Sequence, residues 1–340
     1  MTFVQAVLVL IGLLLAASIV ATRRMARRAT VDYPPAGRWL EIDGTRLHYV
    51  DKGTGRPIIL IHGLRGSLYE FEASITDRVA RHYRVIAFDR PGHGYSSPLP
   101  DECHSLAEEA RTLHAAAEEL GLHRPMLVGY AIGAAVAMAY ADAYPDDVER
   151  IITISGHVMP YPVHVGPLAF FARNPWIAGM VSNTLLLPVG RMIGHWLLRR
   201  ICSPQPAPAS YTRAVLAMAL RPRTFRYVAV ELEQSAEELR QIARRYASFP
   251  VPVTVLAGRD DAISGVKEAQ WFHRRLRLST LVLVPGGGHA LHATHPDLVA
   301  AAMRGADGPV AATEDPDDAL MSRCDPMCAQ SLWAQRPSVR

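Results

Sequence analysis

The chain opens with a long apolar segment that no charge interrupts. Residues 3–21 read FVQAVLVLIGLLLAASIVA, with Gln5 and Ser18 as the clearly polar side chains. A helix rises about 1.5 Å per residue, so this run just spans a hydrocarbon core of about 30 Å. A secretory signal peptide or a buried core helix are the alternatives, but a signal peptide carries its positive charge before the apolar run, and here the charge follows. We predict a transmembrane anchor over residues 1–22.

A basic segment follows the anchor, and we interpret residues 23–38 as a juxtamembrane linker. By the positive-inside rule, its arginines stay on the cytoplasmic side of the membrane. This orientation predicts a single-pass membrane protein whose N-terminus lies outside and whose body faces the cytoplasm. The arginines are also expected to contact anionic lipid headgroups, so the bilayer is a predicted partner. They are Arg23, Arg24, Arg27 and Arg28.

The other end of the chain carries no periodic pattern. Residues 305–340 are rich in Ala, Asp and Pro, which predicts a disordered tail. Cys324 and Cys328 form a C-x-x-x-C pair that could supply half of a zinc site. Because no second pair stands nearby, a solvated tail without metal is the favoured interpretation. The body of the chain is therefore expected over residues 39–304.

The body alternates between short apolar runs and helical patterns. An alternating stretch around Gly44 and Thr45 predicts an antiparallel hairpin. Continuously apolar runs then predict strands that are covered on both faces. Helical patterns separate these runs, so the segment reads as β-α-β units in a mostly parallel, doubly wound α/β sheet. The predicted buried strands are 57–63, 83–89, 125–130, 150–155, 253–258 and 280–286, and the predicted helices are 106–120, 134–144 and 268–277.

The alternation stops over residues 157–249, which are helical and apolar. Their central part, residues 176–201, reads WIAGMVSNTLLLPVGRMIGHWLLRRI. A second membrane span is one interpretation, but polar residues and a proline interrupt it. A helical cap laid over the sheet is favoured, with some of its apolar side chains lining a pocket for an apolar or amphipathic small molecule. The interrupting residues are Asn183, Pro188, Arg191 and His195.

Composition and charge narrow the possible classes of protein. The chain is 49% hydrophobic and 20% charged with four cysteines, which disfavours full disorder, a polytopic membrane protein and a disulfide scaffold. The formal net charge is +4, and residues 1–38 alone hold five arginines against Asp32. The positive excess therefore lies beside the predicted membrane anchor, so no nucleic-acid partner is expected.

Four glycine-containing loops follow predicted strands, where open α/β sheets bind their ligands. Glycines in such loops let backbone N–H groups turn towards a substrate oxygen. A phosphate-binding lysine loop, a dinucleotide fingerprint and a metal-ligand cluster are missing from the sequence, so no cofactor and no metal are expected. The loops are HGLRG at 62–66, DRPGHGYS at 89–96, GYAIG at 129–133, and GRDD at 258–261 together with GH at 288–289.

Together these loops resemble the α/β-hydrolase fold superfamily, and in detail its single-domain members with a helical cap between the sixth and seventh strands. The resemblance covers residues 39–304. It implies a nucleophile at the centre of G-x-S-x-G on a strained strand-to-helix turn, followed along the chain by an acid and a histidine. By position, it implies His289 as general base and Asp261 as the acid that orients it. Leu64 and Ile132 would supply the N–H groups of the oxyanion hole.

The same resemblance assigns supporting positions. Gly63 belongs to the loop at 62–66 that carries Leu64, which we call the oxyanion loop. Gly129 and Gly133 flank the strand-to-helix turn at residue 131, which we call the elbow. Asp260 is the rival acid, less favoured because the family usually has its acid three positions after the glycine. His62 belongs to the common His-Gly loop and is expected to orient that loop. Weaker candidates for proton transfer are His93, His292 and His295.

Ala131 is the departure from the family pattern, because it occupies the nucleophile position. A methyl group cannot attack a carbonyl carbon, and His289 then has no hydroxyl to deprotonate. The neighbours offer no replacement, since Tyr130 is expected to point away from the pocket and Ile132 contributes its backbone. Hydrolysis of an ester through an acyl-enzyme is therefore not expected of this chain.

Three hypotheses remain open from the sequence. Ala131 replaces the serine of a Ser-Asp-His hydrolase that acts on an ester or similar acyl bond. Alternatively, His289 and Asp261 transfer protons without a covalent intermediate. In the third, the chain is a pseudoenzyme whose capped pocket holds a lipid-like ligand without reaction. The sequence also leaves open whether the alanine is natural at this position.

Overall fold

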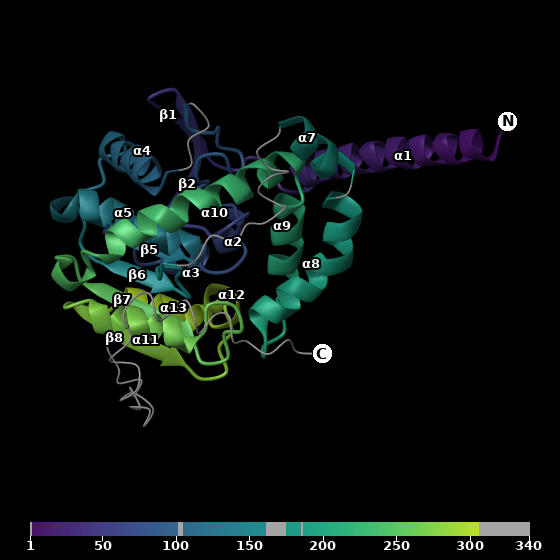
Figure 1. The fold of residues 1–340 in the computed structure, drawn as a ribbon. Helices are drawn as coiled ribbons and strands as arrows, with labels where there is room; N and C mark the ends of the chain where they lie inside the picture. The colour runs from purple at the N-terminus through teal and green to yellow at the C-terminus, as the bar shows by residue number, and fades with distance from the viewer. Residues whose placement is uncertain (1, 101–104, 161–174, 185, 306–340) are drawn as a thin grey trace.

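The computed structural model describes residues 2–100, 105–160, 175–184 and 186–305. Apart from Gly305, the predicted tail over residues 305–340 lies outside the described residues, and so does the Cys324 and Cys328 pair. An eight-stranded sheet forms the centre of the body (Figure 1).

The strand order in the sheet is β1-β2-β4-β3-β5-β6-β7-β8. The pairs β1–β2 and β2–β4 are antiparallel, and every later neighbour pair is parallel, which confirms the predicted hairpin and the mostly parallel sheet. Asp43 and Gly44 turn the hairpin with φ of 47° and 78°, as a two-residue turn of this kind requires. The strands are β1 (Arg38–Ile42), β2 (Thr45–Lys52), β3 (Pro57–Ile61), β4 (Arg84–Phe88), β5 (Met126–Tyr130), β6 (Ile151–Ile154), β7 (Val253–Gly258) and β8 (Ser279–Val284).

Helices cover both faces of the sheet. Successive strand residues point to opposite sides, so each strand contributes side chains to two cores. In β3, Ile59 and Ile61 pack into the core beneath α4 (Leu106–Glu119), α5 (Ile132–Ala143) and α11 (Val266–Arg275). Ile58 and Leu60 face the other core. That second core is closed by α2 (Tyr69–Glu72), α3 (Thr76–Val79), α12 (Leu291–Thr294) and α13 (Pro296–Met303). The described part of the body also contains the short 3₁₀ turns η2 (Pro145–Asp147) and η3 (Tyr246–Ser248).

Among the described residues, four cap helices stand between β6 and β7, where the sequence predicts a helical cap. They are α7 (Pro175–Thr184), α8 (Leu186–Cys202), α9 (Ala209–Ala219) and α10 (Pro222–Ala243). In Figure 1, α10 runs across the body near α5, while α8 and α9 stand together at the end of the body nearest α1. The cap therefore contacts both the sheet domain and the N-terminal helix.

The N-terminal helix α1 (Phe3–Asp32) is longer than the predicted anchor. Thr2 and Gln5 form a capping box at its start, and the helix continues through the arginines that we assigned to a linker. Ala, Met and Arg favour helix, and Thr22 and Ala29 are buried against the rest of the molecule, so the helix persists to Asp32. Its apolar part is long and apolar enough to cross a membrane, by length and composition.

Candidate active site

The turn between β5 and α5 holds Ala131 in a strained conformation. Its φ is 49° and its ψ is −118°, a region that residues other than glycine occupy at a cost of about 1–3 kcal/mol. Three backbone hydrogen bonds keep it there. The N–H of Ala131 donates to the carbonyl of Ile154 at 3.0 Å, and its carbonyl accepts from the N–H groups of Ala134 at 3.1 Å and His157 at 2.9 Å. The elbow geometry is present although the residue in it is alanine.

The flanking glycines let the backbone segments around this turn approach one another. A Cβ on Gly129 would lie 2.5 Å from the backbone N of Ala134, and one on Gly133 would lie 2.3 Å from the carbonyl oxygen of Ile61. A Cβ on Gly63 would lie 3.3 Å from the Cβ of Ala131. The loop after β3 therefore lies directly against the elbow.

His289 and Asp261 are hydrogen-bonded, with Nδ1 of the imidazole 2.9 Å from Oδ2 of the carboxylate. Both side chains are buried. Oδ1 of Asp261 accepts the backbone N–H groups of Ile263 at 2.7 Å and Ser264 at 3.1 Å. Burial opposes ionisation of Asp261, but the bonds from His289 and these N–H groups outweigh it and lower the pKa of the carboxyl. An ionised Asp261 orients His289 with Nε2 as its basic nitrogen, whereas Asp260 is exposed to solvent.

Two backbone N–H groups stand at the elbow, that of Ile132 directly after Ala131 and that of Leu64 directly after Gly63, which lies against Ala131. In the part of the chain that the structure describes, neither Leu64 nor Ile132 directs its N–H to an acceptor. His62 orders the first loop, because its Nδ1 bonds the carbonyl of Gly63 at 2.9 Å and its Nε2 accepts the N–H of Arg90 at 3.0 Å. Burial, with the nearby charges of His93 and Arg90, holds the pKa of His62 well below its usual range. His62 is therefore a neutral, orienting residue.

Comparison with known proteins identifies the family. A family model of the alpha/beta hydrolase fold matches residues 56–296. The chain belongs to the α/β-hydrolase fold family. Haloalkane dehalogenase 2 of Mycobacterium tuberculosis is 27% identical over 285 residues, which cover 80% of this chain and 94% of the relative. A putative non-heme chloroperoxidase of Synechocystis is 26% identical over 269 residues, 74% of this chain and 91% of the relative.

Solved structures agree on the fold of the hydrolase. A thermophilic esterase from Thermogutta terrifontis superposes with a TM-score of 0.65 at 22% identity, over 79% of this chain and 97% of the esterase. The epoxide hydrolase CorEH gives a TM-score of 0.63 at 22% identity, over 78% of this chain and 96% of that protein. The named activities of these proteins differ, so the structural similarity shows the fold of this chain and does not assign it a reaction.

Tyr130 does not point away from the site, contrary to the prediction. Its ring is buried, with its centroid 5.3 Å from that of His289 and 4.3 Å from that of His292. His292 is fully buried, and its ring nitrogens have no hydrogen-bond partner among the described residues. Burial lowers the pKa of His292 to about 3, so it stays neutral. His295, the other nearby candidate, bonds Thr294 through its Nδ1 at 3.0 Å.

Glu70 is a buried carboxyl that the sequence analysis missed. Its Oε2 accepts the N–H of Gly63 at 3.3 Å, in the oxyanion loop itself. Gly66 leaves room for it, since a Cβ there would lie 2.7 Å from the same oxygen. Burial raises the pKa of Glu70 to about 8, although the Gly63 N–H and the charge of Arg90 act in the opposite direction. Glu70 is therefore a neutral acid beside the oxyanion loop, whereas a glutamate in a loop is ordinarily exposed.

His157 is a second histidine at the elbow that sequence reasoning missed. Its backbone N–H bonds the carbonyl of Ala131, and its ring centroid lies 5.8 Å from that of His289. Its Nδ1 lies 3.6 Å from Oε2 of Glu268. Burial lowers the pKa of His157, but the nearby carboxylate of Glu268 outweighs this and raises it. The available signal was its position directly after a predicted strand, where the other site loops also stand.

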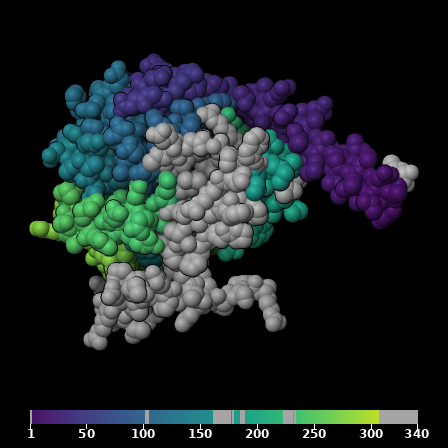
Figure 2. Space-filling view, turned by 45° about the horizontal axis from the view of Figure 1, so that its top comes forward, coloured from purple at the N-terminus to yellow at the C-terminus, as the bar shows by residue number. Residues whose placement is uncertain are grey.

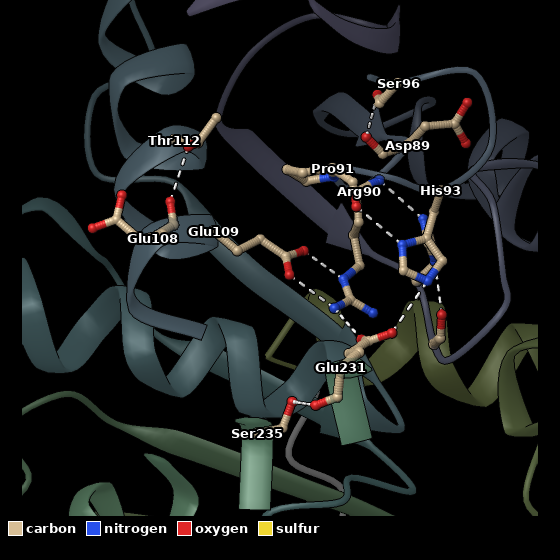
Figure 3. Close-up of polar contacts among 12 residues, drawn as sticks. Asp89, Arg90, Pro91, His93, Ser96, Glu108, Glu109, Thr112, Glu231 and Ser235 are labelled. Atoms are coloured by element: carbon tan, nitrogen blue, oxygen red, sulfur yellow. Dashed lines mark hydrogen bonds and ion pairs between the residues drawn. The ribbon is translucent and has the colours of Figure 1, made fainter. Parts of the chain in front are cut away.

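His93 belongs to a separate buried cluster that joins the cap to the body (Figure 3). Arg90 Nε and Nη2 donate to the two carboxylate oxygens of Glu109 at 2.5 and 2.8 Å, and Nη2 also bonds Glu231 of α10. His93 Nε2 lies 3.2 Å from Oε2 of Glu231. Burial opposes ionisation of Glu231, but Arg90 and His93 outweigh it and lower its pKa. This cluster is a structural connection, so the weak claim of His93 to proton transfer is not supported by its contacts.

Within the described residues, no group of three His, Cys, Asp or Glu side chains is arranged to hold a metal ion. The expectations of no metal and no cofactor remain predictions.

Proposed function

We propose that the hydrolase carries a site for an ester or similar acyl bond in an apolar small molecule, with Ala131 standing where the nucleophilic serine would be. The observation that carries this proposal is the strained elbow at Ala131 beside the hydrogen-bonded His289 and Asp261. The N–H groups of Leu64 and Ile132 supply the complementary oxyanion hole. The chain then binds its substrate without forming an acyl-enzyme.

The missing hydroxyl is the reason why we expect no acyl-enzyme hydrolysis from this chain. Hydrolysis through an acyl-enzyme needs an oxygen that attacks the carbonyl carbon while the imidazole takes its proton. The methyl group of Ala131 has neither a lone pair nor an acidic proton. In a serine protease, removing the catalytic serine lowers kcat by a factor of about 2 × 10⁶.

The test is to restore the serine in the full chain. In detergent, we expect Ala131→Ser to hydrolyse short- and medium-chain acyl esters with a burst, while the parent chain shows none. Adding Asp261→Asn should lower the gained activity by about 10⁴-fold, because the imidazole loses its orienting partner. Asp260→Asn is the matched control and should leave the gain intact, since Asp260 is exposed. A folded Ala131→Ser protein without a burst would contradict the proposal.

A carboxylate at position 131 tests the competing chemistry. One relative is named haloalkane dehalogenase 2, and carboxylates also act as covalent nucleophiles. We expect Ala131→Asp to remain inactive on chloroalkanes and epoxides. Halide release or epoxide opening by Ala131→Asp, with no ester hydrolysis by Ala131→Ser, would replace the acyl assignment with a displacement reaction.

Proton transfer is the second candidate function, and His157 favours it. His157 and His289 lie beside the elbow in the loops after β6 and β8, and each has a buried carboxylate partner, Glu268 and Asp261. Glu268 raises the pKa of His157, which suits an acid, while Nε2 of His289 suits a base. Such a pair needs no nucleophile at residue 131.

This second function is tested on the parent chain. Exchange of the α-hydrogens of apolar ketones in D₂O, followed by NMR, should be lost in His289→Gln. It should change its pH profile in His157→Gln, because the two imidazoles act as opposite partners. Binding of apolar ligands without exchange or hydrolysis in any form would instead make the protein a ligand-binding pseudoenzyme.

We also propose that α1 anchors the hydrolase in a membrane, with the N-terminus outside and the body in the cytoplasm. The apolar part of α1 is followed by arginines whose placement agrees with the positive-inside rule. A cysteine introduced by Thr2→Cys should react with an impermeant reagent added to intact cells. Protection of that cysteine until lysis would overturn the orientation.

A further inference from the structure

The cap helix α8 exposes an apolar stripe to solvent. Its members recur at the three- and four-residue spacing of one helical face. Met192 and Trp196 are 74% and 61% exposed. An amphipathic helix of a soluble domain normally buries such a stripe, so this one lacks its partner within the described chain. The exposed stripe consists of Val189, Met192, Ile193, Trp196 and Leu197.

The opposite face of α8 already has its packing partner. A Cβ on Gly190 would lie 2.2 Å from Leu220, and one on Gly194 would lie 2.7 Å from Leu216, so the two glycines let this face contact α9 and its end closely. Leu198 is buried in the same small core. Helix α8 thus has two apolar faces. One packs against α9 within the cap, and the other is the exposed stripe.

Helix α8, which carries the stripe, lies at the end of the body from which α1 projects (Figure 1). In that view α8 runs across the direction of α1, and Figure 2 shows α1 extending past the teal surface of the cap. Two contacts show which part of α1 packs against the cap. Ser18 bonds the carbonyl of Thr184 at the end of α7, and Arg191 Nη1 donates to Met25 Sδ at 3.2 Å. Ser18 belongs to the apolar run, so the cap reaches the last turns of the predicted span.

Positive charge surrounds the stripe. Three exposed arginines come from α8, and its range contains no acidic residue. The guanidinium of Arg200 lies 5.9 Å from the ring centroid of Trp196. An apolar helical face with Trp and flanking arginines is typical of helices that lie in the plane of an anionic membrane surface. The arginines of α8 are Arg191, Arg199 and Arg200, and those of α1 are Arg23, Arg24, Arg27 and Arg28.

We propose that α8 lies in the bilayer interface beside α1, with the exposed stripe in contact with lipid. This inference rests on the proposed membrane anchor. The orientation suits both helices, because α1 would cross the bilayer while α8 would lie along its surface. The bilayer is thus the occupant of the stripe, and α8 is a second membrane contact besides α1.

The membrane contact borders the candidate site. The carbonyl of Ile201, in the last turn of α8, accepts the N–H groups of His289 at 2.9 Å and Ala290 at 3.3 Å. Gly288 permits this contact, since a Cβ there would lie 2.2 Å from the carbonyl oxygen of Ser203. The histidine loop is therefore held by the helix that touches lipid. This arrangement favours a substrate dissolved in the bilayer.

Quenching of tryptophan fluorescence tests the inference. The full chain is reconstituted in vesicles of phosphatidylcholine and phosphatidylglycerol with plain or brominated acyl chains. We expect brominated lipid to quench the parent chain and to quench Trp196→Phe clearly less. Trp271→Phe is the matched control and should retain the quenching, because Trp271 packs against Tyr246 on the body. Equal quenching of the parent and Trp196→Phe would overturn the lipid contact.

Two further measurements separate the possible failures. Extraction of the chain from vesicles by alkaline carbonate would overturn the anchor, whereas retention without quenching at Trp196 would overturn the contact of α8 alone. A second copy of the chain is the other possible occupant. If Met192→Cys forms disulfide-linked dimers in vesicles above the background of the parent chain, the stripe contacts a second copy. That result would overturn the proposal.

Discussion

Two buried polar regions meet at His62 and differ in how their charges are matched. In the cluster of Arg90, Glu109, Glu231 and His93, both carboxylates bond the guanidinium of Arg90, and the cap is joined to the body. On the other side of His62, Glu70 accepts a backbone N–H, and no cation bonds it among the described residues. A glutamate carboxyl is therefore held ionised at Glu231 and neutral at Glu70.

This difference distinguishes polar groups that connect parts of the fold from polar groups that are available to bind a ligand. A buried ion pair that is hydrogen-bonded on both partners acts as a fixed connection, since removing one partner is costly. Both regions contain polar atoms without a hydrogen-bond partner among the described residues, but in the cluster these atoms belong to side chains that are themselves ion-paired, Arg90, His93 and Glu231. Around Ala131 they are the N–H groups of Leu64 and Ile132 and both ring nitrogens of His292, and these groups are available to a ligand.

The largest effect should come from Arg90→Met. The substitution leaves Glu109 and Glu231 buried without their cation, and breaking a buried pair in this way costs about 3–5 kcal/mol. We expect a fall of that size in the free energy of unfolding, measured by denaturant in detergent. Hydrogen–deuterium exchange should also rise in α10, which carries Glu231.

Arg111→Met is the control for that prediction. Arg111 pairs with Asp43 and Glu108, but its side chain is 45% exposed, and exposed pairs contribute about 0–1 kcal/mol. A loss in Arg90→Met no larger than the loss in Arg111→Met would mean that the buried cluster does not connect the cap to the body.

A pH-dependent effect is expected from Glu70→Gln. The pKa of Glu70 is about 8 in the folded chain, against an ordinary value of 4.5. The folded state therefore holds a proton that the unfolded state has lost, so the contribution of Glu70 to stability is full below pH 4.5 and falls as pH rises to 8. Glutamine does not titrate, and its amide oxygen can still accept the Gly63 N–H.

The measurement is the difference in free energy of unfolding between the two proteins at pH 5, 6.5 and 8. As pH rises, the free energy of unfolding of Glu70→Gln should increase relative to that of the parent chain by about 1.4 kcal/mol per pH unit. Glu119→Gln, at an exposed helix position, should give a difference that does not change with pH. A flat difference for Glu70→Gln would show that its carboxyl is ionised like that of Glu231.

The sequence predicted the sheet because burial on both faces leaves a direct pattern of apolar residues. Residues 57–63 and 125–130 were recognised as strands in this way, and the cap was recognised because the alternation stopped. The G-x-x-x-G motif marked the elbow, since only small residues fit beside Ala134 and Ile61. These features depend on local composition and order.

The missed features depend on contacts between distant segments. Glu70 reads as an exposed loop residue, and only the packing of α2 beneath the oxyanion loop buries it. His157 becomes relevant because Glu268, in another helix, approaches it. The end of α1 also escaped prediction, because Ala29 is buried by tertiary packing that the linker sequence does not reveal. Sequence patterns report the burial of an element but not the partners of its polar groups.

The smallest effect should come from Ala131→Gly. Glycine is ordinarily unfavourable, by about 0.5–1 kcal/mol relative to alanine, because it has more freedom in the unfolded chain. At a φ of 49° and a ψ of −118°, alanine is strained by about 1–3 kcal/mol, and glycine is not. The two terms have opposite signs, so we expect Ala131→Gly to raise the free energy of unfolding by up to about 2 kcal/mol. Ala115→Gly, in the middle of α4, should lower it by about 1 kcal/mol. A loss at both positions would mean that the elbow relaxes when no nucleophile has to be presented.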